Sequence, residues 1–183
     1  LRLQGLARYQ GAVDAYQMAQ SFKPDFLDAF YNMGVAYGCM EENGIDALHK
    51  AVWVFKKSID INPEFIHAYT ALGASYIKQG ELELAIEVLN RAVSVDPKDS
   101  NVYYYFGIAC RMDAQKSEAV RNMRHAVVLK PDSVQMQSYL GLSLMDLEMY
   151  DDAGNAFREV VRIKPDFAEG HFMLGKLFRE HLS

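Results

Sequence analysis

Apolar residues recur along the chain at helical spacing, and the stretch from Ile66 to Pro97 shows the pattern most completely. One apolar stripe begins at Tyr69 and a second at Ala85, and each advances in the three- and four-residue steps of one helix face. Gly80 lies between the stripes, and Pro97 closes the second. Glycine tolerates the backbone angles of a tight turn, and proline ends a helix because it lacks an amide hydrogen. The stretch therefore predicts two short helices joined by a tight turn.

The same pattern returns at a fixed period. Pro63, Pro97, Pro131 and Pro165 follow one another at intervals of 34 residues, whereas Pro24 precedes Pro63 by 39 residues. Ahead of each of the later four prolines, an alanine and then a bulky apolar residue stand at matching offsets. A fixed period of this length is typical of a stack of repeats in which each copy buries one face against its neighbours.

These residues resemble the tetratricopeptide repeat family, whose first helix carries a large residue, Leu-Gly and Tyr, and whose second carries Ala, an aromatic residue and a closing Pro. The resemblance covers nearly the whole chain. It implies an all-α fold, a right-handed superhelical solenoid of antiparallel helix pairs, in a single domain over residues 1–183. The expected copies are a partial repeat at 1–25 with a second helix only, a repeat with a five-residue insertion at 26–65, repeats at 66–99, 100–133 and 134–167, and a terminal first helix or cap at 168–183.

The two copies nearest the N-terminus depart from the regular pattern. The chain is expected to open on the tail of a first helix, with Tyr9 at the turn before a complete second helix. In the next copy, the insertion falls between Tyr37 and Ala51. We expect it to lengthen the turn or the helix ends around Met40 to Leu48, where the pair Asn43-Gly44 supplies turn chemistry, and we expect the second helix to start early.

Two side chains stand at offsets where other copies carry another residue type. Trp53, the only tryptophan, replaces polar residues such as Glu87. We expect the inserted turn to fold over Trp53 and bury it; the alternative is an exposed aromatic anchor for a partner. Gln137 replaces the large residue of a first helix, and Tyr139 and Leu142 are expected to fill part of the missing volume.

Composition narrows the class of protein. The net charge of -5, without a clustered basic face, argues against nucleic acid as a partner. No apolar run approaches the roughly 18 residues that a membrane-spanning helix needs, so a soluble protein without a membrane span is expected. Cys110 occupies a core position and Cys39 lies near the end of a first helix, so no disulfide is expected between them. Free thiols fit a reducing compartment, and the expected location is cytoplasmic.

No catalytic constellation emerges from the sequence. The five histidines are scattered over different repeats, and no pair of His or Cys residues has metal-ligand spacing. The glycines that recur at the period of the repeat are explained by close helix packing rather than by a phosphate-binding loop. We therefore expect no enzyme activity, no catalytic residues, no cofactor and no metal.

The resemblance also indicates where a partner would bind. In this family, stacked first helices line a concave groove with the side opposite their core stripe, and helix geometry places residues two before, one after and five after the large residue on that side. Aromatic and aliphatic residues at these offsets favour a protein or peptide with apolar anchors. The candidate groove residues are Tyr31, Asn32, Val35, His67, Thr70, Asn101, Tyr104, Tyr105, Ile108, Gln135, Tyr139, Leu142 and Phe172. The alternative is that Tyr104, Tyr105 and Tyr139 mainly pack between neighbouring first helices.

The leading hypothesis is a protein-protein interaction scaffold or adaptor that holds a partner polypeptide in this groove. Co-chaperone members of the family grip an acidic C-terminal peptide with a set of Lys, Asn and Arg side chains, and the matching positions here carry other residues, such as Tyr31, Val35 and Ala71. One alternative is the substrate-recruiting arm of a larger enzyme, such as a glycosyltransferase. Another is a self-assembling structural protein, a homo-oligomer that docks through its terminal helices or through Trp53.

Overall fold

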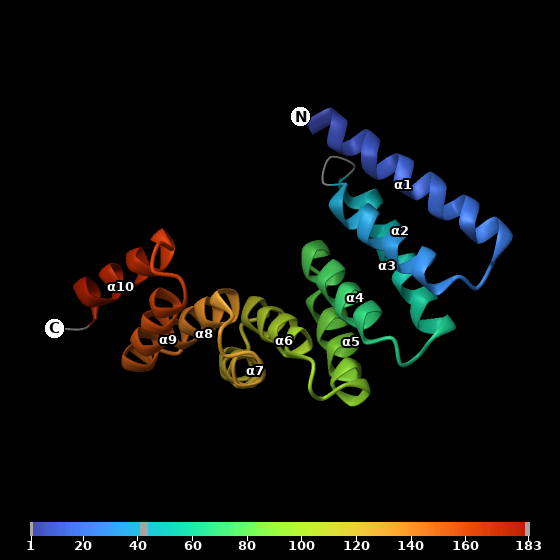
Figure 1. Cartoon of the computed structure of the whole chain (residues 1–183). Helices are drawn as coiled ribbons and strands as arrows, with labels where there is room; N and C mark the ends of the chain where they lie inside the picture. Colours follow the sequence, from blue (N-terminus) through green and yellow to red (C-terminus); the bar gives the residue numbers. More distant parts are fainter. Residues whose placement is uncertain (1, 41–43, 182–183) are drawn as a thin grey trace. The chain divides into compact units, whose positions relative to one another are not determined.

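The computed structural model describes residues 2–40 and 44–181, and within these ranges the chain forms helices and turns without a strand (Figure 1). The predicted all-α fold is confirmed. The helices are α1 Arg2–Phe22, α2 Leu27–Cys39, α3 Gly44–Ile61, α4 Ile66–Gln79, α5 Leu82–Val95, α6 Ser100–Met112, α7 Lys116–Leu129, α8 Val134–Asp146, α9 Tyr150–Ile163 and α10 Ala168–Glu180.

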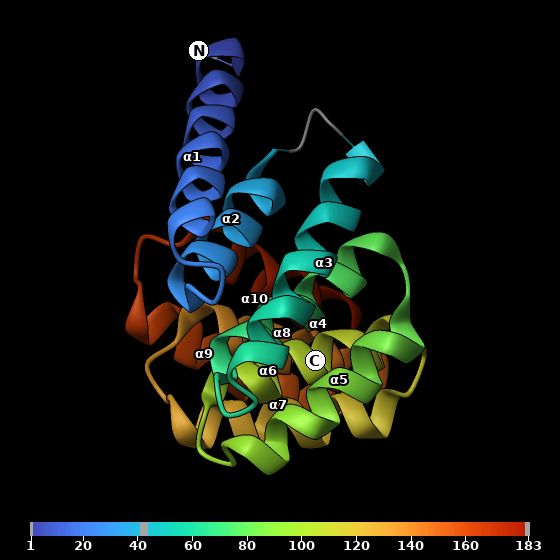
Figure 2. The ribbon, with the colours of Figure 1, turned by 90° about the vertical axis from the view of Figure 1, so that its right-hand side faces the viewer.

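Contacts group the helices into two compact units, one from Leu1 to Asp96 and one from Pro97 to Ser183. In the first unit, α2 packs on α3 and α4 on α5, and α1 lies beside α2 in both views (Figures 1 and 2). In the second, α6 packs on α7 and α8 on α9, and α10 packs on α9. The four regions 26–65, 66–99, 100–133 and 134–167 therefore each contain a pair of adjacent helices.

Each helix pair is held together by a glycine of its first helix and a large side chain of its second. A Cβ on Gly73 would lie 2.7 Å from the Leu89 side chain, which is fully buried, so no larger residue fits there without displacing Leu89. The periodic glycines thus have a packing role. The pairs are Gly34 with Phe55, Gly73 with Leu89, Gly107 with Met123, and Gly141 with Phe157.

The turn inside the regular repeats uses a left-handed backbone conformation at one fixed position. Gly80, Ala114 and Glu148 occupy this position with φ values of 80°, 58° and 61°. The amide of the following residue then donates to a carbonyl in the last turn of the first helix, as from Glu81 to Tyr76 at 3.0 Å. This bond pairs a carbonyl that the end of the helix would otherwise leave without an intrahelical donor.

The N-terminal part of the chain differs from the expectation in one respect. Residues 2–22 form the single continuous helix α1, so the turn predicted at Tyr9 is wrong. The prediction of an early second helix is confirmed, because α3 has 18 residues whereas α5, α7 and α9 have 14 each. The predicted turn at Asn43 lies outside the described residues.

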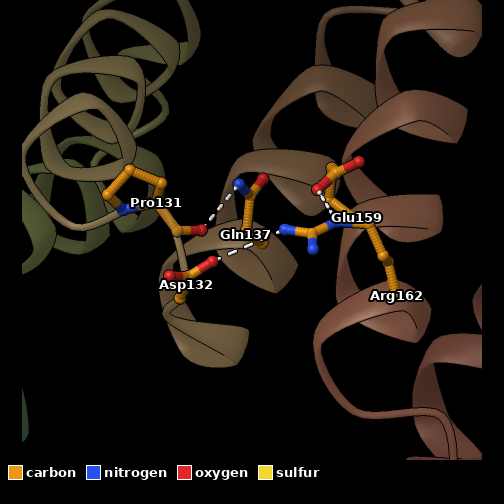
Figure 3. A network of polar contacts seen from close by, with 5 residues as sticks. All are labelled: Pro131, Asp132, Gln137, Glu159 and Arg162. Atoms are coloured by element: carbon orange, nitrogen blue, oxygen red, sulfur yellow. Dashed lines mark hydrogen bonds and ion pairs between the residues drawn. The ribbon is translucent and has the colours of Figure 1, made fainter.

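Gln137 is buried in α8, where it takes the place of a large apolar residue. Its side-chain nitrogen donates to the carbonyl oxygen of Pro131 at 3.1 Å (Figure 3). In the same network, the Arg162 guanidinium lies 2.7 Å from a Glu159 carboxylate oxygen and 3.5 Å from one of Asp132. The Gln137 side chain therefore joins α8 to the turn that precedes this helix.

Candidate binding surfaces

Three tyrosines from two first helices form an aromatic cluster in the C-terminal unit. The Tyr104 ring meets the Tyr105 ring edge to face at a centroid distance of 5.2 Å, and it meets the Tyr139 ring in the same way at 5.3 Å. Tyr104 and Tyr105 belong to α6, and Tyr139 belongs to α8. Edge-to-face ring pairs stabilise a protein by more than the area they bury. The cluster therefore holds neighbouring repeats together and also forms part of the surface.

The cluster is half-buried. Tyr104 and Tyr139 pack against the buried core of the unit, as do Ile108 and Leu142. Burial raises the pKa of the Tyr104 hydroxyl to about 12, and the neighbouring Tyr139 and Tyr105 add to the shift. These four predicted groove residues therefore divide their area between repeat packing and the surface.

Other predicted residues of the C-terminal unit lie in solvent. Phe172, on α10, has 69% of its area exposed. Asn101 and Gln135 are exposed in the first turns of α6 and α8. An aromatic ring exposed to this extent is free to contact another molecule.

The N-terminal unit brings a second set of predicted residues together. The Tyr31 ring lies edge to face with Phe65 at 5.2 Å and tilted against His67 at 6.3 Å. His67 also contacts Phe65 edge to face at 5.5 Å. Phe65 precedes α4 and was not among the predicted residues, because it lies outside the helix on which the groove offsets were counted. Val35 remains 40% exposed.

Two predicted residues of this unit use their polar groups within their own helix. The Asn32 side-chain nitrogen donates to the carbonyl of Asp28 at 2.8 Å. Thr70 is buried, and its hydroxyl donates to the carbonyl of Ile66 at 3.1 Å. Thr70 is therefore not available to a partner at the surface.

Trp53 contradicts the expectation that the inserted turn buries it. The ring is 55% exposed, and its centroid lies 6.3 Å from that of Phe30. It borders a cavity of about 530 Å³ in the N-terminal unit, which none of the predicted groove residues lines. The other copies carry polar residues at the position of Trp53, and this pattern already indicated an exposed position.

The described part of the chain holds neither a cluster of metal ligands nor a helix suited to span a membrane. Residues 2–40 and 44–181 contain no group of three or more His, Cys, Asp or Glu side chains arranged to hold a metal ion. In the same ranges, no helix combines the length and apolar character that a membrane crossing requires. Cys39 is exposed and Cys110 is buried, and both are free thiols as predicted.

Comparisons with known proteins agree with the repeat pattern. Two models described as tetratricopeptide repeat match residues 54–87 and 139–167, and one described as TPR repeat matches residues 73–110. A search of curated proteins found no match to the sequence.

Similar solved structures extend over most of the chain. MamA from Desulfovibrio magneticus RS-1 is 24% identical, covers 91% of this chain and 93% of its own, and has a TM-score of 0.73. TTC0263, a thermophilic TPR protein of Thermus thermophilus, is 18% identical, covers 97% and 94%, and also has a TM-score of 0.73. YrrB, described as a TPR protein with an unusual peptide-binding site, is 17% identical, covers 91% and 84%, and has a TM-score of 0.71. At these identities the likeness is one of fold.

Proposed function

The chain belongs to the tetratricopeptide repeat family, and on that premise we propose that it is a protein-interaction scaffold whose first helices bind a partner polypeptide. Family and fold support the general role, because stacked repeats of this kind present extended surfaces to other proteins. The proposed role is non-enzymatic. Each unit carries a proposed surface of its own, namely the solvent side of α2 and α4 in the first unit and of α6, α8 and α10 in the second.

The observation that carries the proposal is the aromatic surface of the C-terminal unit. Tyr104, Tyr105 and Tyr139 form one cluster of half-buried rings, and Phe172 adds a ring that is 69% exposed. Rigid aromatic rings lose little entropy on binding and provide most of the energy of protein interfaces. The description of YrrB as having a peptide-binding site supports a peptide as the kind of ligand.

The partner we expect is a segment with apolar anchor side chains. Half-buried tyrosines offer flat rings together with hydroxyl groups, so they contact an apolar side chain and hydrogen-bond the backbone beside it. Exposed amides at Asn101 and Gln135 stand at the starts of the same helices, where they are able to bond the peptide backbone.

The proposal is tested with a phage-displayed library of random linear peptides selected on the purified chain. Selected peptides are then titrated against a double variant, Tyr105→Ala with Phe172→Ala, in which Tyr104 and Tyr139 still support the fold. We expect binding to weaken at least about tenfold, because aromatic hot spots dominate such interfaces. The matched control is Phe22→Ala, which removes a ring that is 84% exposed on α1, in the N-terminal unit.

The two variants separate the outcomes. If every selected peptide bound the double variant as tightly as the wild type, the proposed surface would be contradicted. Peptides that lose affinity for the double variant and keep it for Phe22→Ala support it. Circular dichroism at the temperature of the binding assay verifies that both variants retain their helices.

A further inference from the structure

The cavity beside Trp53 is bounded by three helices of the N-terminal unit. Its base is formed by the core side of α4, where Leu72 and Tyr76 are 3% and 6% exposed. Its two walls come from the second helices α3 and α5, with Trp53 on the first and Leu84 on the second. The volume of about 530 Å³ is within the roughly 300–1,000 Å³ typical of ligand sites.

Each wall exposes a large apolar side chain. Trp53 is 55% exposed and Leu84 is 42% exposed, although both border a hollow with an apolar base. On one side, the Trp53 ring packs against Phe30, with the ring centroids 6.3 Å apart and the planes inclined at 54°. Tryptophan is among the residue types most enriched at the energetic centres of interfaces, so an exposed tryptophan beside an apolar hollow indicates a binding surface.

Cations surround this apolar surface. Lys56 lies over the Tyr76 ring at 5.6 Å, and Arg91 lies over the Tyr69 ring at 5.9 Å, so both positive groups are held at the cavity by the aromatic rings that line it. A third cation, Lys57, is paired with Asp60 at 3.2 Å.

Lys56 and Arg91 remain able to bind an anion. In the described ranges, neither has a carboxylate within ion-pair distance, although Glu87 and Asp60 also line the cavity. Within the described part of the chain, the positive groups of Lys56 and Arg91 therefore line the cavity without a paired carboxylate. Their charge complements a ligand that carries carboxylates beside an apolar group.

We propose that this cavity is a second binding site, which takes an acidic peptide segment of a partner protein with one large apolar anchor side chain. The anchor enters between Trp53 and Leu84, and flanking Asp or Glu residues of the peptide pair with Lys56 and Arg91. The site lies between the second helices α3 and α5 over the core side of α4, whereas the surface proposed above lies on the solvent side of the first helices, so the two ligands do not compete.

The experiment selects phage-displayed random peptides on the wild-type chain, after removal of phage that bind a Lys56→Gln/Arg91→Gln variant. The enriched peptides are expected to share an aromatic or aliphatic residue flanked by acidic residues. Trp53 is the only tryptophan, so its fluorescence directly reports whether a selected peptide reaches the cavity. We expect a saturable change in Trp53 emission and weaker binding at higher salt, because ions screen exposed charge pairs.

A matched control distinguishes binding at the cavity from a general effect of removing positive charge. Arg158→Gln/Lys164→Gln removes two cations that also lie over aromatic rings, Phe178 at 5.8 Å and Phe167 at 5.3 Å, in the other unit. This control is expected to bind selected peptides like the wild type. The cavity variant is expected to bind them at least about tenfold more weakly, and Trp53→Ala likewise when followed by anisotropy of a labelled peptide.

Four results would overturn the proposal. The first is enrichment of peptides without acidic residues, and the second is equal loss of affinity in the cavity and control variants. The third is concentration-dependent dimerisation in sedimentation that Trp53→Ala abolishes, because the cavity would then be filled by a second copy of this chain. Loss of peptide binding only in the Tyr105 and Phe172 variant would support the first-helix surface and contradict this cavity.

Discussion

Gln137 donates a hydrogen bond from its side-chain nitrogen to the carbonyl oxygen of Pro131, six residues earlier, at 3.1 Å. The next copy repeats this relationship, because His171 Nε2 lies 2.8 Å from the carbonyl oxygen of Pro165, again six residues earlier. At the same offset from their prolines, earlier copies carry the rings of Tyr69 and Tyr103. A polar side chain thus replaces an aromatic ring by bonding the turn instead of filling volume.

We predict that Gln137→Ala lowers the free energy of unfolding by about 1 to 3 kcal/mol, through the lost hydrogen bond and the volume removed from a buried site. Urea unfolding followed by circular dichroism measures the change. Gln135→Ala is the control, since Gln135 is exposed on the same helix and its removal should change stability by less than about 0.5 kcal/mol. Equal stabilities of the two variants would show that the bond to Pro131 contributes nothing.

At the left-handed turn position, glycine is expected to give a more stable protein than alanine. Ala114→Gly should raise the free energy of unfolding by about 0.5 to 1 kcal/mol, because a residue with a Cβ is strained at the observed φ of 58°. Gly80→Ala should lower it by about 1 kcal/mol for the same reason. Thermal unfolding of the variants gives both values.

The control for this pair is Ala15→Gly, at an exposed position inside α1. There, glycine should destabilise by about 1 kcal/mol, because it costs more backbone entropy in a helix than alanine does. If Ala114→Gly destabilised the protein like Ala15→Gly, the left-handed conformation at this turn would be excluded.

Tyr104 predicts a loss of stability in alkali. Its pKa is raised from 10.0 to about 12 by burial, so between pH 10 and pH 12 the unfolded chain releases this proton while the folded chain keeps it. The unfolded state then binds fewer protons, and the free energy of unfolding falls as pH rises through this window. The contribution is fully present below pH 10 and is lost as pH rises through about 12.

Urea midpoints measured across this pH range test the linkage. Tyr104→Phe should weaken the pH dependence, because phenylalanine has no proton to release. Tyr9→Phe, at a tyrosine that is 37% exposed on α1, should leave the wild-type slope unchanged. Identical slopes for wild type and Tyr104→Phe would contradict the assignment.

The two cysteines should differ in reactivity. Cys110 is 1% exposed, and burial raises the pKa of its thiol to about 11, with the carboxylates of Glu118 and Asp113 adding to the shift. Only the thiolate reacts, so Cys110 should resist alkylation in the folded protein while the exposed Cys39 reacts. Mass spectrometry after iodoacetamide treatment should find one modified cysteine in the native chain and two after denaturation. Rapid native alkylation of a Cys39→Ser variant would contradict this.

The periodicity of the sequence predicted the helix pairs because the residues that hold each pair together recur at a fixed spacing. Gly73 and Leu89 illustrate this, since the side-chain space removed at one position is occupied from the other. The turn at Gly80 was predicted for a similarly local reason, namely its backbone conformation. Such features depend on one repeat, so a single sequence contains them.

Side-chain exposure depends on contacts between repeats, and here the sequence was a weaker guide. Thr70 was expected in the groove, but it is buried, and Tyr104 divides its area between the core and the surface. Trp53 was expected under the inserted turn, yet much of the extra length lies in α3, which extends the helix instead of covering the ring. The cavity near Trp53 was not foreseen because it is formed jointly by three helices of adjoining copies.

The contact between a first-helix glycine and a second-helix side chain has an evolutionary consequence. Both partners belong to the same copy, and the filling group differs from copy to copy, being Phe55, Leu89, Met123 and Phe157 in turn. A gene duplication or a recombination event that moves a whole copy therefore carries a matched set of internal contacts with it. The array is able to gain or exchange whole copies while each copy keeps its own contact between the glycine and the second-helix side chain.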